Sequence, residues 1–197
     1  MDKRYGFEHM TPAQASMADA LESLLCKKPL SSIDVKQLCD EAHVARSTFY
    51  THYGNIDELM EQLEDIHIAR ITAMNDWVAS PGMIDSTSLS PYEPTLDYLE
   101  ANSAFFYAEL VIRHNGRLSE KWKDAIKAHL RKRLDRETGL MARTDFLMEV
   151  AASVVVSACI FWLNDPSSVP REDVHAALSR SLEILPAFTG KSEIRPF

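Results

Sequence analysis

The sequence predicts an all-α protein in which a small helix-turn-helix domain (residues 1–54) precedes a larger helical domain (residues 55–197). Apolar residues recur at helical spacing along the chain, and no strand pattern or internal repeat competes with them. Only six of the 197 residues are glycine. Residues 32–63 contain two short helix patterns joined by a tight turn. We therefore expect about nine helices in total, three of them in the N-terminal domain.

The first two helices are predicted from their apolar spacing and from one cap. The first covers about residues 12–28, and its buried stripe comprises Ala20, Leu21, Leu24 and Leu25. The second follows Asp34, whose side chain can cap it with Gln37 three residues later, the spacing of a capping box. Its inward face comprises Val35, Leu38, Cys39 and Ala42. Both helices are therefore expected to be amphipathic.

A turn at His43 and Val44 leads into a third, short helix from about Ala45 to Tyr53. Phe49 and Tyr53 are four residues apart and can anchor this helix to the rest of the domain. The other side chains then face largely outward: Arg46, Ser47, Thr48, Tyr50, Thr51 and His52. Such a face suits hydrogen bonds to the base edges and phosphates of DNA.

The larger domain begins with a long helix over about residues 56–79. Asn55 is its expected cap, with Glu58 at the partner position. A loop containing Pro81, Pro91 and Pro94 follows. The remaining helices are expected at residues 92–102, 103–114, 118–138, 144–163 and 171–188.

Residues 44–59, VARSTFYTHYGNIDEL, resemble the signature of TetR/AcrR-type bacterial transcriptional regulators. The most recognisable positions of that signature are matched by Thr48, Tyr50, His52 and Leu59. The resemblance covers about the first 65 residues by motif and the remainder by helical layout alone. It implies a DNA-reading domain followed by a domain that dimerises and typically senses a small molecule.

The resemblance also implies roles for individual residues. Bases would be contacted by Arg46, Ser47 and Thr51, and phosphates would be held by Thr48, Tyr50 and His52, with Lys36 beside the groove. Three positions depart from the family pattern: Ile56 replaces a usual Lys that meets a phosphate, Ala45 replaces a common Ser or Thr cap, and Ser47 replaces a common Gly or Pro. Loss of the Lys is expected to lower the salt dependence of binding by about one unit of slope.

Charge is unevenly distributed along the chain. The net charge is −8, which is the wrong sign for a protein whose whole surface meets DNA. Residues 1–46 hold six Lys and Arg against seven Asp and Glu, residues 47–112 hold one against eleven, and residues 113–136 hold nine against three. The near-neutral DNA-reading domain predicts modest non-specific affinity.

The basic segment, residues 113–136, has two interpretations. It could form a second nucleic-acid surface or the wall of an anion site. Alternatively, it is a solvated helix that pairs with the acidic fourth helix, which is the usual role of a charge run and the one we favour.

The last two predicted helices carry more apolar surface than one core contact requires, which favours a homodimer. The candidate interface residues are Val150, Val154, Val155, Ala158, Trp162, Val174, Leu178 and Leu182. The alternative is that both faces are consumed inside the domain. The resemblance implies that these helices pack with their twins as a four-helix bundle. Two-fold symmetry would then imply a palindromic operator.

A pocket for a small-molecule effector is expected among the aromatic residues of the larger domain. The candidate lining residues are Met74, Trp77, Phe105, Phe106, Trp122, His129 and Phe161. The alternative is that they are simply core. A metal site at Asp65, His67 and His114 is disfavoured because the three lack a compact ligand spacing. No cofactor is predicted.

Several other classes of protein are disfavoured. The most apolar run, Val150 to Leu163, is interrupted by Ser153 and Ser157 and is better interpreted as a buried helix than as a membrane span. The N-terminus lacks an apolar export segment. The three cysteines, Cys26, Cys39 and Cys159, are odd in number and widely spaced, as for structural thiols in the cytoplasm.

Catalysis has little support, because no Gly-rich phosphate loop, nucleophile elbow or paired-histidine metal motif is present. The sequence therefore favours a cytoplasmic, dimeric, DNA-binding transcriptional regulator, most often a repressor that an effector relieves. The rival function is a protein-interaction co-regulator on the same fold whose DNA binding is weak or lost, which Ile56 and the near-neutral reading domain favour.

Overall fold

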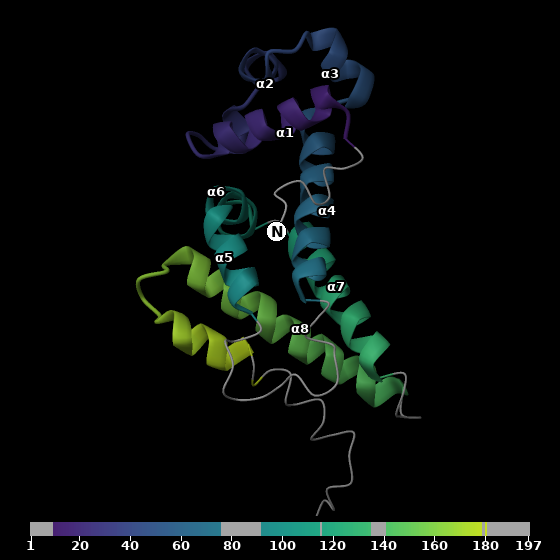
Figure 1. Cartoon of the computed structure of the whole chain (residues 1–197), viewed down its shortest axis with the longest axis vertical. Coiled ribbons are helices and arrows are strands. Elements are labelled where there is room, and N and C mark those ends of the chain that lie inside the picture. The colour runs from purple at the N-terminus through teal and green to yellow at the C-terminus, as the bar shows by residue number, and fades with distance from the viewer. Residues whose placement is uncertain (1–9, 76–91, 115, 135–140, 179, 181–197) are drawn as a thin grey trace, which may run out of the picture.

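The computed structural model describes residues 10–75, 92–114, 116–134, 141–178 and 180. All regular secondary structure in these ranges is helical (Figure 1), as predicted. The elements are α1 (Pro12–Leu25), η1 (Leu30–Ser32), α2 (Val35–Ala42), α3 (Arg46–His52), α4 (Ile56–Asn75), α5 (Glu93–Ala101), α6 (Ser103–Phe106), η3 (Tyr107–Ile112), α7 (Gly116–Leu134) and α8 (Met141–Asn164), and then a helix over residues 171–178. The predicted loop at residues 80–91 and the ends of the predicted helices at 56–79, 118–138 and 171–188 lie outside the described residues.

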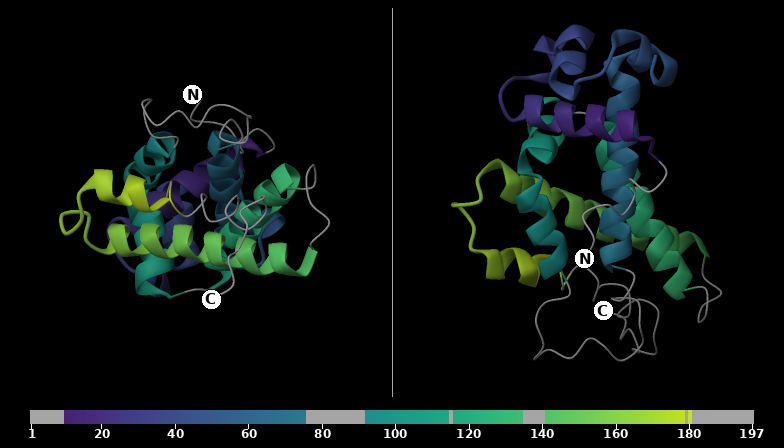
Figure 2. Two further views of the ribbon diagram at one scale, coloured as in Figure 1. Left: turned by 90° about the horizontal axis from the view of Figure 1, so that it is seen from below. Right: turned by 45° about the horizontal axis from the view of Figure 1, so that its top comes forward.

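The helices form two parts. The first, here called the head, comprises α1, α2 and α3 at one end of the molecule (Figure 1). The second, here called the body, comprises the elements from α4 onward. Helix α1 lies between α2 and α3 on one side and the body on the other (Figure 2), and α4 runs from the head down into the body.

The starts of the head's helices follow from their capping residues. The Asp34 carboxylate accepts a hydrogen bond of 2.8 Å from the Gln37 N–H, and the Gln37 side chain accepts one of 3.3 Å from the Asp34 N–H. The predicted capping box of α2 is therefore confirmed. Helix α1 begins with a box of the same kind between Thr11 and Gln14.

Helix α4 begins at its predicted cap. The Asn55 side chain accepts a hydrogen bond of 3.0 Å from the Glu58 N–H. The Glu58 carboxylate reaches back and accepts one of 2.7 Å from the Gly54 N–H. The first bond satisfies an N–H group that the first turn of a helix leaves without a partner, and the second fixes the backbone just before the cap.

The turn between α2 and α3 depends on a left-handed residue. His43 has φ 54° and ψ 39°, and α2 ends there. This conformation reverses the chain direction but crowds the Cβ atom of any residue other than glycine. The turn of the helix-turn-helix motif therefore carries local strain at His43.

The body contains one irregular helical segment. The chain expected as one helix over residues 103–114 divides into α6 and the π-helical turn η3, and α7 begins at Gly116 rather than at Leu118. Pro94, expected in the preceding loop, lies in the first turn of α5, where its missing N–H costs no hydrogen bond.

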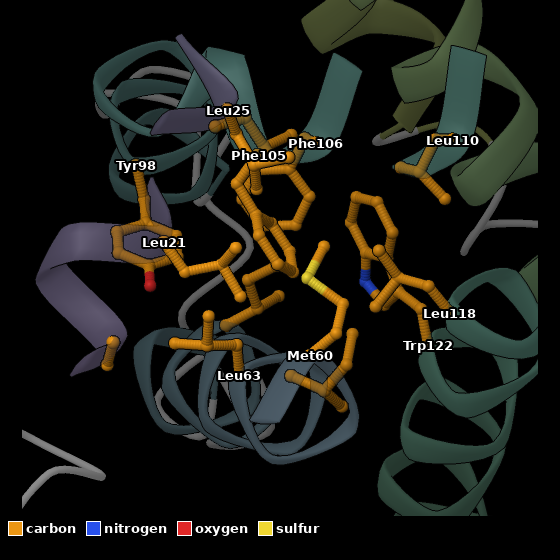
Figure 3. Packing of buried hydrophobic residues seen from close by; sticks show 14 of the residues in the cluster. Leu21, Leu25, Met60, Leu63, Tyr98, Phe105, Phe106, Leu110, Leu118 and Trp122 are labelled. Carbon is orange, nitrogen blue, oxygen red and sulfur yellow. The ribbon is translucent and has the colours of Figure 1, made fainter. Parts of the chain in front are cut away.

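One hydrophobic cluster joins the head to the body. Figure 3 shows Leu21 and Leu25 of α1 beside Phe105 and Phe106 of α6, with Trp122 of α7 on their far side. All five side chains are buried. Because α1 contributes to this cluster, the head packs on the body through a shared core.

Helix α8 is the most apolar element. Its segment Asp145–Asn164 is long and apolar enough to cross a bilayer by length and composition, a longer run than the sequence pattern indicated. Half of the segment's most apolar stretch is buried inside the fold. Helix α8 packs against α7 and η3, so it serves as a core helix.

The cysteines are free thiols within the described chain. Cys39 and Cys159 are buried, whereas Cys26 is exposed at the end of α1. Burial raises the pKa of the Cys159 thiol to about 12, so Cys159 stays protonated as an inert core side chain.

Candidate nucleic-acid interface

Helix α3 is anchored by two aromatic side chains on one face. Phe49 and Tyr53 are buried, with ring centroids 5.7 Å apart. The Tyr53 hydroxyl donates a 2.5 Å hydrogen bond to the Gln62 side chain on α4 and accepts one of 3.3 Å from the Gln14 amide on α1. Burial raises the pKa of Tyr53, so the phenol keeps the proton that it donates. Helix α3 is thus tied to α1 and to α4.

The opposite face of α3 is open to solvent. Arg46, Ser47, Tyr50 and Thr51 are exposed, and Thr48 and His52 are half-buried. The Tyr50 side chain is 60 % exposed, although it is a large aromatic residue. Six of the seven residues that the sequence assigned to DNA contact therefore lie on one short helix at the outer end of the head (Figure 1), and the seventh, Lys36, lies on α2.

Two cations dominate this outer face. Lys36 and Arg46 are exposed and form no ion pair with another residue in the described parts of the chain. The other described cations of the head are engaged: Lys27 lies 3.2 Å from Glu41, and Lys28 donates to the Gln37 side chain. The local positive charge that could meet phosphate therefore rests on Lys36 and Arg46.

The Thr51 side chain has a defined hydrogen-bonding role. Its hydroxyl donates a 2.9 Å hydrogen bond to the Ser47 carbonyl, one turn earlier in α3. The hydroxyl proton is therefore used inside the helix, and the oxygen remains as an acceptor. In the major groove, acceptors suit the exocyclic amines of adenine and cytosine.

The start of α4 faces the body as well as solvent. Ile56 is half-buried, packs against the core cluster and lines a groove of about 820 Å³ between head and body. The neighbouring Asp57 lies 3.4 Å from Arg113 of the body, and Arg113 lies 2.8 Å from the buried Glu109. The position where the family usually has a Lys is thus an apolar contact at the junction.

The basic segment is paired with acidic neighbours. Arg117 binds the buried Glu64 at 2.8 Å, and Lys121 binds Asp65 at 2.6 Å, so α7 is fastened to α4. Lys127 binds Glu149 of α8 at 2.8 Å. The predicted pairing of this segment with the acidic fourth helix is therefore confirmed, and these cations are committed to carboxylates within the protein.

The residues proposed for an effector pocket do not all lie together. Phe105, Phe106 and Trp122 are buried and contact one another, with centroids 5.2 Å apart for the two Phe rings and 6.3 Å apart for Phe106 and Trp122. Met74 and His129 are half-buried, and Trp77 lies outside the described residues. Phe161 is 65 % exposed on α8, so its assignment to an enclosed pocket was wrong.

The residues proposed for the dimer interface divide between two faces of the last helices. Val155, Trp162, Val174 and Leu178 are buried within the single chain and cannot form an exposed contact surface, which corrects their assignment. Val154 is exposed, Val150 and Ala158 are half-buried, and Leu182 lies outside the described residues. The sequence analysis missed Phe146, which is 67 % exposed on the same face as Val150 and Val154. Its spacing of four residues from Val150 could have revealed it.

The three residues considered for a metal site are separated by their roles. His67 is buried and bonded to Glu22 and Tyr98, whereas Asp65 is exposed and paired with Lys121. His114 is exposed after η3, with φ 48°.

No family model matches the sequence, and no curated protein matches it. Solved structures do match over most of the chain. The dihydroxyacetone kinase operon activator DhaS superposes with a TM-score of 0.65 at 17 % identity, over 90 % of this chain and 96 % of its own. SmeT, the repressor of the Stenotrophomonas maltophilia multidrug efflux pump SmeDEF, matches with a TM-score of 0.58 at 10 % identity, over 94 % and 96 %. The TetR-family repressor AlkX from a Dietzia strain matches with a TM-score of 0.54 at 19 % identity, over 87 % and 95 %.

These structural superpositions establish the fold of the chain. It is the all-helical fold that TetR-family transcriptional regulators have, and it extends through the body. The sequence motif resembled this family in the head alone. The superpositions extend the structural likeness over most of the chain.

Proposed function

We propose that this chain is a DNA-binding transcriptional regulator of the TetR/AcrR type that acts as a homodimer on a palindromic operator. The observation that carries the proposal is the outer face of α3, where Arg46, Ser47, Tyr50 and Thr51 are exposed on a helix anchored from behind by Phe49 and Tyr53. An α-helix fits the major groove of B-DNA, and these side chains match the hydrogen-bonding groups found there.

The proposed contacts divide into two kinds. Arg46, Ser47 and Thr51 read base edges, and Arg46 is suited to bidentate contact with guanine. Phosphates are held by Thr48, Tyr50 and His52, with Lys36 beside the groove. Among the described residues of the head, Lys36 and Arg46 alone bring open positive charge to this face, so we expect specific contacts to supply a larger share of the affinity than in a strongly basic head.

A second copy of the chain is the proposed occupant of the outer face of α8. Phe146, Val154 and Phe161 are 67 %, 38 % and 65 % exposed, and Val150 lies between the first two on the same stripe. The spacing of four, four and seven residues keeps these side chains on one side of the helix. A two-fold symmetric contact through this stripe would give a dimer with two heads, one for each half-site of a palindromic operator.

Regulation by a small molecule is part of the proposal. Effector binding would release DNA only if the effector had a higher affinity for a head spacing that does not fit the operator. The three matched proteins named above are one activator and two repressors. Repression relieved by an effector is the form that we propose, and the fold is compatible with activation.

A co-regulator that acts through another protein is the second candidate function. The groove between head and body is bordered by the exposed Ile112 and Tyr107, which are 56 % and 39 % exposed. Such exposed apolar side chains are more common at contact surfaces than at random on a protein surface. The near-neutral head also favours this candidate.

Binding of the purified full chain to DNA tests the proposed function. Fluorescence anisotropy at low salt would compare fragments from the region upstream of its own gene with scrambled DNA of equal length. Arg46→Ala is expected to lower the affinity for the bound fragment by at least about tenfold, the loss typical of one specific base contact.

Arg131→Ala is the matched control, because it removes an exposed arginine of the body that is paired with Asp145. It should leave binding unchanged. If no upstream fragment binds at low salt and Arg46→Ala has no effect, the DNA-binding proposal fails and the co-regulator function remains.

A further inference from the structure

A buried histidine connects the head to the body. His67 lies in the middle of α4 and is 1 % exposed. Its Nε2 atom lies 2.9 Å from the Glu22 carboxylate on α1, and its Nδ1 atom lies 2.6 Å from the Tyr98 hydroxyl on α5. Both ring nitrogens are therefore used, one toward the head and one toward the body.

The chemistry of the three groups fixes the direction of these hydrogen bonds. A carboxylate only accepts, so Nε2 of His67 carries the hydrogen that faces Glu22. In the tautomer whose only ring hydrogen is on Nε2, Nδ1 accepts from the Tyr98 hydroxyl. Burial raises the pKa of Tyr98 to about 12, so the phenol keeps its proton at neutral pH and donates it. The relay runs from Tyr98 through His67 to Glu22.

The surroundings hold the His67 ring in place. It stacks on Phe105 with centroids 4.0 Å apart and meets the edge of Phe106 at 5.1 Å. Figure 3 shows Tyr98, Phe105 and Phe106 against Leu21 of α1. The Arg70 guanidinium lies 5.6 Å from the centre of the Tyr98 ring and is the nearby positive charge. The relay therefore crosses the shared core at the head–body junction.

We propose that His67 is a positioning residue that sets the angle of the head on the body, with Glu22 as its partner on the head and Tyr98 as its partner on the body. The apolar contacts around it are non-directional and tolerate small displacements, whereas hydrogen bonds weaken steeply with misalignment. The relay thus selects one arrangement among those that the apolar contacts allow.

Only the consequence for DNA binding rests on the proposed function. In a dimeric regulator, the head angle sets the distance between the two reading helices, which must match the half-site spacing. An effector that separates Tyr98 from His67 would release the head without touching α3.

The head angle can be measured without DNA. Spin labels are placed on the full chain at Asp40→Cys in α2 and Ala128→Cys in α7, both exposed, after Cys26→Ser removes the exposed native thiol. Labelled protein is diluted with unlabelled protein. Pulsed electron paramagnetic resonance then reports only the distance between the two labels of one chain. The labelled chain in which Glu22, His67 and Tyr98 are intact should give one narrow distribution of distances between the labels.

Three variants and a control then decide the proposal. Glu22→Ala and Tyr98→Phe should each broaden or shift the distribution, whereas Glu22→Gln should preserve it because an amide oxygen also accepts from Nε2. Ser23→Ala removes the 2.9 Å hydrogen bond from Ser23 to Glu41, which lies within the head, and should leave the distance unchanged. An unchanged distribution in Glu22→Ala and Tyr98→Phe overturns the proposal, as does a Glu22→Gln variant that behaves like Glu22→Ala.

DNA binding supplies the second readout. Glu22→Ala and Tyr98→Phe should weaken binding to the upstream fragment by about fivefold, as for one lost hydrogen bond, without changing its salt slope. If the unmodified chain binds no DNA, the proposed function fails, while the distance measurement still decides the role of His67.

Discussion

The Tyr53 hydroxyl, at the end of α3, donates a 2.5 Å hydrogen bond to the Gln62 side chain of α4. The same hydroxyl accepts from Gln14 of α1, so one buried phenol connects three helices. A rotation of α4 must therefore carry α3 with it.

Lys36→Ala is expected to weaken binding to all DNA sequences similarly and to reduce the salt slope by about one unit, because Lys36 offers charge rather than base recognition. The measurement is a series of anisotropy titrations at increasing salt. Lys27→Ala is the control, because Lys27 is already paired with Glu41. A slope that does not change in Lys36→Ala would place Lys36 away from phosphate.

Ile56→Lys is expected to tighten binding to all sequences and to steepen the salt slope by about one unit. The Lys stem can occupy the apolar groove that Ile56 lines, and the ammonium group can extend from it toward a phosphate. Ile56→Met is the uncharged control in the same titrations. An unaltered slope would mean that the start of α4 does not face the DNA backbone.

The head could be predicted closely from sequence because its signals are local. The cap at Asp34, the turn at His43 and the anchors Phe49 and Tyr53 lie within twenty residues of one another, and each is fixed by spacing. The cap at Asn55 was predictable for the same reason.

Long-range contacts could not be predicted in the same way. The partners of His67 are 45 and 31 residues away in sequence, and nothing in the spacing pairs them. The sequence also could not show which side chains of α8 are buried and which are exposed, because that helix is apolar on most sides. Trp162 and Phe161 are adjacent aromatic residues, yet one is buried and the other exposed.

His43→Gly is expected to raise the free energy of unfolding by about 1 kcal/mol, because glycine adopts the left-handed conformation at this position without steric cost. Urea denaturation followed by circular dichroism measures the change. His43→Ala keeps a Cβ atom and should give no such gain. Equal stabilities for the two variants would show that the turn stores no strain.

Phe161→Glu and Phe146→Glu are each expected to shift the proposed dimer to monomer, because each places a charge in the proposed interface. Sedimentation velocity at several protein concentrations measures the shift. Ile112→Glu changes an exposed apolar residue on η3, outside the stripe, and should leave the oligomeric state unchanged. If all three variants sediment like the parent, the outer face of α8 is not the interface.

Alkaline pH is expected to destabilise the fold through Tyr98. Its pKa is raised from 10.0 to about 12 in the folded chain, mainly by burial. The associated stability is complete below pH 10 and is lost as the pH rises toward about 12, because the unfolded phenol ionises first. The loss amounts to at most about 3 kcal/mol for a rise of the pKa from 10.0 to about 12.

Urea denaturation of the parent and of Tyr98→Phe across this pH window tests the expectation. The variant should show a shallower decline in unfolding free energy, whatever its stability at neutral pH. Parallel declines would mean that Tyr98 does not stay protonated in the fold.

The continuous cluster from Met17 in α1 to Leu178 near the end of the described chain restricts how this protein could be recombined. Leu21 and Leu25 are buried partly by Phe105 and Phe106, more than 75 residues later (Figure 3). A chimera that grafts residues 10–54 onto an unrelated body would expose that surface and lose the relay through His67. A transplant that keeps the proposed DNA specificity must therefore carry α4, α5 and α6 along with the head, and evolution by simple exchange of heads faces the same constraint.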